Sequence, residues 1–382
     1  MSAIIKLGKT IIKRNDDNVY IIAEIGQNHQ GNLETAKQMI MEAKFSKILF
    51  LILTLQRIGC DCVKFQKSCL DAKFTAAALQ RQYEDAHSWG NTYGEHKMHL
   101  EFSIAQYQIL KELCEKIGLD FTASAMDEVS LCQLDALDVP FIKIGSGDAN
   151  NFPLLKKAAQ LKRPLVISTG MQNMKTINRI VGIMKENNKF DYALMHCISA
   201  YPTQPQDCRL RMITLLKQKF PDVLIGYSGH ELGVEISKAA VSLGARILER
   251  HFTLDKKQKG SDHQCSLEPQ EMEQLVYYIR SLKSSPLILS DLHDNEELMA
   301  ALNPIEERRL FPCELKCHSK LGKSLVAARC ISAGKILDET DVLIKVSEPS
   351  GIPADEYYNV IGAQMNENIY QDSPLLWRHI KK

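Results

Sequence analysis

The sequence predicts an α/β fold, a (β/α)8 TIM barrel followed by a small C-terminal β-rich domain. Eight short apolar runs alternate with segments of helical period. The runs are almost continuously hydrophobic, as are parallel strands that helices cover on both faces. Eight such units within about 250 residues favour a closed barrel over an open doubly wound sheet. The predicted strands are residues 19–26, 61–66, 119–124, 139–146, 163–169, 191–197, 222–228 and 245–252.

The segments between the runs carry apolar residues at positions i, i+3 and i+4, which indicates amphipathic helices. Examples are NLETAKQMIMEAK, SIAQYQILKELCEKIG and VEISKAAVSLG. No GxGxxG or GxxxxGK[ST] motif supports a nucleotide-binding sheet. Near Lys316 the alternation gives way to short strands and Gly/Pro turns. We therefore predict a barrel over 1–285, a linker with one short helix over 286–318 and a small domain over 319–382.

The composition is that of an ordinary soluble globular protein and excludes collagen-like, coiled-coil and disordered classes. Among 382 residues, 47 Lys and Arg face 46 Asp and Glu, a net charge of +1 that gives no electrostatic reason to expect nucleic acid as a partner. The most apolar run, 48–55, is too short to span a membrane, and the N-terminus has no signal-peptide pattern. Eleven cysteines, an odd number without a CxxC pair, indicate reduced thiols in the cytoplasm.

Polar residues gather at the carboxyl ends of the predicted strands, where barrels assemble active sites. Lys64 and Lys143 interrupt apolar runs, and Glu24 lies near the end of the first strand. Unpaired buried charges cost on the order of several kcal/mol, so the pattern predicts a pocket for an anionic ligand. Snorkelling or ion-paired lysines and a satisfied buried acid are the structural alternatives. Further candidates are Ser146, Asp148, Ser199, Tyr201 and Ser228.

Two histidines, His230 and His251, follow or end neighbouring predicted strands, with Glu249 and Asp262 close by. Adjacent strands lie about 4.8 Å apart, so both imidazoles could reach one ion. Such a ligand set suits Mn2+, Zn2+ or Fe2+ better than Mg2+. Purely structural histidines are the alternative.

Eight motifs occur in order from about residue 20 to the C-terminus: AEIGQNHQG, VKFQKS, SWGNTYGEHK, KIGSGDANNFPLL, SAYPTQP, GYSGHE, ERHFTLDKKQKGSDHQCSLEP and LGKSLVAA. Together they resemble the sialic acid synthases, most closely their animal members. The resemblance implies a TIM barrel with a C-terminal SAF (antifreeze-like) domain. It also implies a homodimer in which each SAF domain reaches over the partner's barrel mouth.

The resemblance further implies a condensation of phosphoenolpyruvate with N-acetylmannosamine 6-phosphate or N-acetylmannosamine. The products would be N-acetylneuraminate 9-phosphate or N-acetylneuraminate, plus phosphate. It implies that His230 and His251 bind a divalent metal, Mn2+ first, with Mg2+ or Co2+ as alternatives. The residues it implies for phosphoenolpyruvate are Lys64, Lys143, Ser146, Ser199, Tyr201 and Ser228. Those it implies for catalysis on the sugar and water are Glu24, Asp148 and Asp262, with Lys323 reaching the partner's sugar.

The sequence departs from bacterial members in several places. Ser199, Asp148 and Lys323 stand where bacterial members carry Asn, Glu and Arg, and lysine lacks the planar fork of arginine. Two segments, about 45–58 and 281–294, look inserted, the first on the barrel face away from the mouth. Another metal-dependent barrel enzyme that uses phosphoenolpyruvate, such as a 3-deoxy-heptulosonate-phosphate synthase, and a non-catalytic binding protein remain alternatives.

Overall fold

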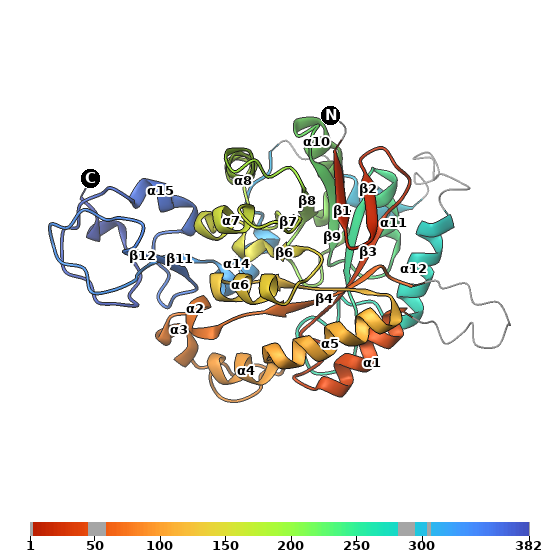
Figure 1. The fold of residues 1–382 in the computed structure, drawn as a ribbon, viewed down its shortest axis with the longest axis horizontal. Coiled ribbons are helices and arrows are strands. Elements are labelled where there is room, and N and C mark those ends of the chain that lie inside the picture. Colours follow the sequence, from red (N-terminus) through yellow and green to blue (C-terminus); the bar gives the residue numbers. More distant parts are fainter. Residues whose placement is uncertain (1–2, 45–58, 282–294, 304–306, 382) are drawn as a thin grey trace.

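The computed structural model describes residues 3–44, 59–281, 295–303 and 307–381. The first predicted insertion, 45–58, and all but the first residue of the second, 281–294, lie outside these ranges. Within them, no helix is both long and apolar enough to cross a membrane. A barrel, an N-terminal hairpin, a connecting segment and a C-terminal module make up the described chain (Figure 1).

Eight parallel strands close into a barrel in the order β10-β3-β4-β5-β6-β7-β8-β9, which confirms the predicted fold class. Every predicted run overlaps one strand of this barrel. The strands are β3 (Tyr20–Gly26), β4 (Cys62–Lys67), β5 (Asp120–Ala125), β6 (Ile142–Ile144), β7 (Leu165–Ser168), β8 (Tyr192–Cys197), β9 (Leu224–Gly229) and β10 (Ile247–His251).

Alternate residues of each strand face the barrel interior, and their character changes along the strand. On β10, Ile247 belongs to the apolar interior cluster, whereas Glu249 and His251 line a pocket. On β4, Cys62 belongs to the same cluster and Lys64 lines the pocket. The interior is therefore an apolar floor at the amino ends of the strands and a polar mouth at their carboxyl ends, as in other barrels of this type.

Helices surround the barrel and pack on its outward-facing strand residues (Figure 1). The α5 helix shows why the local sequence forms one: Ser103 and Gln106 make a capping box at its start. Gly118 ends it in the left-handed conformation, at φ +69°. The helices are α1 (Leu33–Lys44), α5 (Ile104–Ile117), α6 (Glu128–Ala136), α7 (Phe152–Ala159), α8 (Met174–Glu186), α9 (Pro205–Cys208), α10 (Arg211–Lys219), α11 (Glu235–Ser242) and α12 (Pro269–Ser281), with the 3-10 turn η2 (Ser146–Asp148).

An N-terminal hairpin, which the sequence analysis did not predict, closes the floor of the barrel. It consists of the antiparallel strands β1 (Ile4–Leu7) and β2 (Thr10–Lys13). Ile5, Leu7 and Ile12 are fully buried and join the apolar cluster of the barrel interior. The turn residue Gly8 has φ +55°, and a Cβ there would overlap the Asp120 carboxylate, so the close approach requires glycine.

The C-terminal module has its own apolar core and lies beside the helices that follow β4. Its elements are β11 (Ser324–Ala327), β12 (Val342–Lys345), η5 (Ala354–Glu356), α15 (Tyr357–Val360) and η6 (Trp377–His379). The helices beside it are α2 (Leu70–Lys73) and α3 (Ala76–Gln80), with α4 (Tyr93–Leu100) next along the chain. Val346 exchanges backbone hydrogen bonds with Lys73 at 2.8 Å and Thr75 at 3.0 Å.

The connecting segment contains more structure than the single short helix predicted for it. That helix is α13 (Glu296–Ala301). The 3-10 turn η4 (Pro312–Glu314) and the helix α14 (Leu315–Leu321) follow before the C-terminal module. The α14 helix carries residues that line the pocket at the barrel mouth.

Candidate active site

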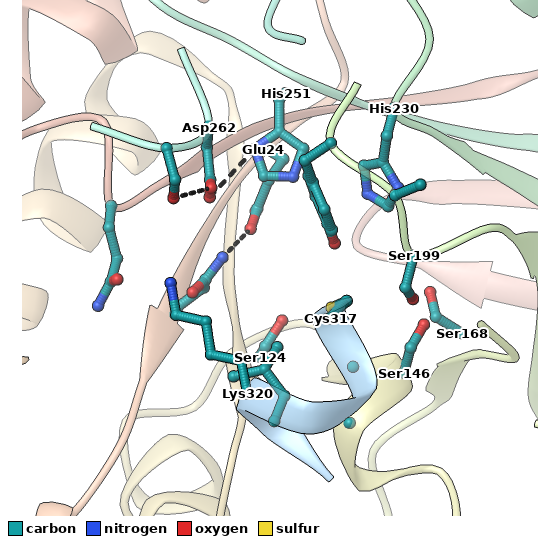
Figure 2. A pocket seen from close by; sticks show the side chains of 18 of the residues that line it. Glu24, Ser124, Ser146, Ser168, Ser199, His230, His251, Asp262, Cys317 and Lys320 are labelled. Atoms are coloured by element: carbon teal, nitrogen blue, oxygen red, sulfur yellow. Dashed lines mark hydrogen bonds and ion pairs between the residues drawn. The ribbon is translucent and has the colours of Figure 1, made fainter. Parts of the chain in front are cut away.

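A pocket of about 560 Å3 occupies the mouth of the barrel. All twelve residues that the sequence analysis selected line it, so the structure brings the whole predicted set together. Figure 2 shows Glu24, Ser146, Ser199, His230, His251 and Asp262 around this pocket. Their individual roles stay predictions. The twelve are Glu24, Lys64, Lys143, Ser146, Asp148, Ser199, Tyr201, Ser228, His230, His251, Asp262 and Lys323.

Two buried lysines and two buried carboxylates form a network at the base of the pocket. Lys64 Nζ lies 2.7 Å from Glu24 Oε2 and 3.6 Å from Glu249 Oε1. Lys143 Nζ lies 3.7 Å from Glu249 Oε2 and donates to Ser168 Oγ at 2.6 Å. These lysines are therefore held by buried carboxylates from other strands and do not snorkel to the surface. Glu249 bridges them.

The two carboxyl groups of this network titrate in opposite directions. Burial, opposed by Lys64 and reinforced by Glu249, raises the pKa of Glu24 to about 7. Burial acts in the same direction on Glu249, but Lys143 and Lys64 outweigh it and lower the pKa to about 2. Glu249 is thus a fixed anion, whereas Glu24 can exchange a proton near neutral pH, as a general acid or base must.

Hydroxyl and amide groups next to Lys143 complete a site for oxyanions. The Gly170 backbone N–H donates to Ser146 Oγ at 3.1 Å. Ser199 Oγ is buried and has no hydrogen-bond partner among the described residues, so it can donate to a ligand. A Cβ at Gly170 would lie 2.3 Å from Ser199 Oγ and 2.6 Å from Ser146 Oγ, which shows how closely the backbone approaches these hydroxyls.

His230 and His251 face each other at the rim of β9 and β10, with ring centroids 5.3 Å apart. His230 Nδ1 donates to the Ile198 carbonyl at 2.8 Å, and the side chain also interacts with the Cys197 thiol. His251 Nδ1 is buried without a hydrogen-bond partner in the described part of the chain, and Asp262 Oδ2 lies 3.9 Å from it. Two imidazoles beside a carboxylate fit a divalent transition-metal ion.

In the described ranges, no group of three or more His, Cys, Asp or Glu side chains is arranged to hold a metal ion, so the two histidines alone are the candidate ligands. A two-histidine site with open positions is the kind that can also bind a substrate or water.

Asp148 and Lys323 form a buried ion pair that also lines the pocket. Lys323 Nζ also donates to the Met126 carbonyl at 2.8 Å. The Lys323 that makes these contacts belongs to the same chain as the barrel. The prediction that Lys323 enters a partner subunit's site was drawn from the resemblance, and it stays a prediction because one chain is described.

Sequence reasoning left out several pocket residues. The sequence analysis places Glu249 close to the histidines without assigning it to the site, although strand alternation puts it on the same face as His251. Four lysines from outside the strands have no signal in the strand pattern. They are Lys73, Lys97, Lys316 and Lys320.

The Arg308–Glu314 ion pair is a second feature that the sequence analysis does not predict. It holds two loops that line the pocket. Both side chains are fully buried and bind through two contacts of 3.0 Å. Glu314 Oε1 accepts the backbone N–H groups of Met171 at 2.7 Å and Ser199 at 3.1 Å. The pair therefore fixes the loops after β7 and β8, which carry the oxyanion site.

Such a concentration of buried charges costs stability, and this cost is usual where a protein binds and transforms a charged substrate. Fold and site thus define a barrel enzyme for anionic substrates. Residues 51–286 match the NeuB family and residues 322–381 match the SAF domain. The chain belongs to the NeuB family, and the resemblance to sialic acid synthases is confirmed.

Individual relatives agree with this assignment. The chain is 59% identical over 370 residues to the N-acetylneuraminate-9-phosphate synthase of Drosophila melanogaster, covering 95% of this chain and 96% of the relative. It is 47% identical over 357 residues to the human protein of the same name, covering 94% and 91%. The crystal structure of the spore coat polysaccharide biosynthesis protein spsE from Bacillus subtilis is similar in fold, with a TM-score of 0.79 at 24% identity, covering 100% of this chain and 99% of that one.

Proposed function

We propose that this chain is a sialic acid synthase that condenses phosphoenolpyruvate with N-acetylmannosamine 6-phosphate or N-acetylmannosamine. The products are N-acetylneuraminate 9-phosphate or N-acetylneuraminate, and inorganic phosphate. The observation that carries this proposal is the joint presence, in one pocket, of the carboxylate-held Lys64 and Lys143 and of the paired histidines. The names of its curated relatives support the same reaction.

The base of the pocket has the chemistry to hold phosphoenolpyruvate. Lys64 and Lys143 supply two ammonium groups, and Ser146 and Ser199 supply hydroxyl donors for phosphate or carboxylate oxygens. Ser228 donates to Glu249 Oε1 at 3.2 Å and lines the same surface. Tyr201 packs on His230 at 4.0 Å between ring centroids and covers the histidine side of the pocket.

In the reaction, the methylene carbon of phosphoenolpyruvate forms a bond to the aldehyde carbon of the open-chain sugar. The aldehyde oxygen takes up a proton and becomes a hydroxyl group. Water adds to the former enol carbon, and one of its protons passes to the carboxylate that protonated the aldehyde oxygen. The C–O bond to phosphate then breaks, the second water proton leaves with the phosphate, and a ketone remains. Glu24, with its pKa near 7, is the group best matched to this proton transfer, while Glu249 stabilises positive charge at the enol carbon.

Asp148 and Asp262 line the same pocket, and their carboxylates can accept hydrogen bonds from sugar hydroxyls. His230 and His251 would hold a divalent ion, Mn2+ before Mg2+ or Co2+. A bound ion supplies Lewis-acid polarisation of the sugar aldehyde.

We also propose a cytoplasmic homodimer. The eleven cysteines are all described and all free, which supports a reducing compartment. In a domain-exchanged dimer, Lys323→Ala subunits mixed with His251→Ala subunits regain part of the activity, because one mixed site has both groups. No gain after confirmed subunit exchange would assign Lys323 to the barrel of its own chain.

The direct test is release of inorganic phosphate from phosphoenolpyruvate, measured with N-acetylmannosamine and with its 6-phosphate, with and without Mn2+. We expect sugar-dependent release in a stoichiometry of one phosphate per sialic acid formed. Release that does not depend on either sugar, or none at all from folded protein, would contradict the proposed function.

A further inference from the structure

Of the lysines that line the pocket beyond the ends of the barrel strands, three are at least half-buried and have no carboxylate within ion-pair distance in the described part of the chain, and we refer to them as the outer lysines. Lys73 lies on α2, Lys97 on α4 and Lys320 on α14, so three separate elements bring them to one pocket. Figure 2 shows the Lys320 side chain extending from α14 into the pocket on the side of Glu24 and Asp262. The reaction as described above uses none of the three.

The outer lysines differ from the other buried lysines of the pocket in their partners. Lys64, Lys143 and Lys323 each lie within ion-pair distance of a carboxylate. Among the described residues, the outer lysines form no such pair. Their ammonium groups donate instead to neutral atoms: Lys73 to Met126 Sδ at 2.9 Å, Lys97 to Gln27 Oε1 at 2.8 Å and Lys320 to Tyr83 Oη at 3.2 Å.

Lys73 gives the strongest reason to expect an anionic ligand. Its side chain is only 6% exposed, and a thioether sulfur is a weak acceptor for an ammonium group. Lys97 and Lys320 both approach the ring of Tyr93, at 5.5 and 5.9 Å from its centroid. Burying positive charges together without a counter-ion is unfavourable, so a ligand that supplies negative charge would stabilise this arrangement.

The pKa values of two of the outer lysines are lowered, whereas that of Lys320 is raised, because the hydroxyl groups of Tyr93 and Tyr83 together with Asp262 outweigh its burial. Burial and the charge of Lys97 lower the pKa of Lys73 to about 8. Burial and the charge of Lys320 lower the pKa of Lys97 to about 8. A phosphate monoester carries nearly two negative charges at pH 7, and its oxygens can accept a hydrogen bond from each of three ammonium groups.

We propose that the outer lysines bind the phosphate group of a sugar 6-phosphate and make the phosphorylated sugar the preferred acceptor. This inference rests on the proposed function and specifies its substrate. In an open-chain hexose the aldehyde and the 6-phosphate are at opposite ends. The aldehyde belongs beside the histidines and Glu24, and the phosphate therefore lies farther out. The charges of Asp148 and Lys323 both act on the pKa of Lys73. The outer lysines therefore lie next to the part of the pocket that is assigned to the sugar.

The test compares two acceptors in the full-length enzyme. Lys73→Met, Lys97→Met and Lys320→Met each remove one charge while keeping an unbranched apolar side chain. Lys157→Met is the matched control, because Lys157 lies on α7 outside the pocket and pairs with Glu128 at 3.0 Å. Phosphate release is measured at saturating phosphoenolpyruvate and Mn2+ while either sugar is varied.

We expect each outer-lysine variant to raise KM for N-acetylmannosamine 6-phosphate by about tenfold or more, the usual effect of losing a charged hydrogen bond. KM for N-acetylmannosamine, KM for phosphoenolpyruvate and kcat should stay within about twofold of the unaltered enzyme. Equal losses for both sugars, or none for the phosphorylated sugar, would overturn the inference. Lys97 and Lys320 are half-buried, so we expect their variants to fold. These two variants test the inference even if Lys73→Met does not fold.

If the unaltered chain uses neither sugar, the proposed function is wrong, and calorimetric titration with N-acetylmannosamine 6-phosphate tests the subsite alone. Binding that is lost in the outer-lysine variants and retained in Lys157→Met supports the subsite. Equal binding to all four proteins overturns it.

Discussion

Glu314 accepts a hydrogen bond from the backbone N–H of Ser199, a residue 115 positions earlier in the chain, at 3.1 Å. The same carboxylate is paired with the fully buried Arg308. A residue of the connecting segment thus sets the position of a backbone that lines the oxyanion site.

We expect Glu314→Ala to destabilise the protein by about 3–5 kcal/mol, since it leaves the Arg308 charge buried and unpaired. Glu314→Gln keeps the shape but removes the charge, and it should raise KM for phosphoenolpyruvate more than KM for the sugar. Denaturant unfolding and steady-state kinetics measure the two effects. Glu297→Gln, an exposed change on α13, serves as the control. Unaltered stability and KM in both Glu314 variants would show that the pair does not support the site.

Metal removal gives a second prediction. Chelation should abolish turnover, and Mn2+, Mg2+ or Co2+ should restore it. His251→Ala should lower kcat by a factor of about a hundred or more, because a catalytic metal contributes several kcal/mol to the barrier. Metal content measured on the same preparations shows whether activity follows occupancy. Full activity of His251→Ala in excess chelator would remove the ion from the reaction.

Deleting residues 45–58 should leave the chemistry intact. The flanking residues lie close together: Cys60 N–H donates to the Ala43 carbonyl at 3.1 Å, and a Cβ at Gly59 would lie 2.4 Å from the Lys44 carbonyl oxygen. Joining Lys44 to Gly59 therefore needs little rearrangement. We expect an unchanged KM for phosphoenolpyruvate and a higher soluble yield, since the segment contains a long apolar run. A folded deletion variant that no longer binds phosphoenolpyruvate would contradict the placement of this segment away from the mouth.

Affinity for the sugar 6-phosphate should depend on pH. Lys73 and Lys97 have their pKa lowered to about 8, so they are protonated below pH 8 and lose charge above it. The ligand becomes a dianion above about pH 6. Binding should be tightest between these limits and weaken as pH rises through 8, while binding of unphosphorylated N-acetylmannosamine should not change for this reason.

Charged and titratable groups around the two lysines set this pH window. For Lys73 they are Lys97, Asp148, Tyr93 and Lys323; for Lys97 they are Lys320, Asp262, Glu101 and Arg81. Titration calorimetry from pH 6 to pH 10 gives the dependence for each sugar, and parallel curves for the two sugars would contradict it.

The barrel and most of the pocket could be predicted from the sequence because both are encoded locally. Each strand is a short apolar run, and Lys64, Lys143 and His251 interrupt or end such runs. Alternation along the strand then determines which side chains share the interior.

The remaining features depend on contacts between distant segments. The outer lysines lie on elements far apart in sequence, and no periodicity connects Lys73 with Lys320. In the sequence, Glu314 looks like any polar residue of a linker. Its role depends on contacts with Arg308 and with the loops after β7 and β8, which only the fold brings together. The hairpin of Ile5 and Ile12 was missed because its apolar residues reveal their burial only against the barrel floor.

That hairpin has a kinetic consequence. Ile5, Leu7 and Ile12 close the floor of the barrel. Substrates and products must therefore enter and leave through the mouth of the barrel. Phosphoenolpyruvate, held at the base by strand residues, has to enter before the sugar occupies the outer half. A sugar that arrives first obstructs its co-substrate, so excess sugar should inhibit competitively toward phosphoenolpyruvate. The N-terminal hairpin therefore determines the order in which the two substrates bind, although it lies at the opposite end of the barrel and contacts neither of them.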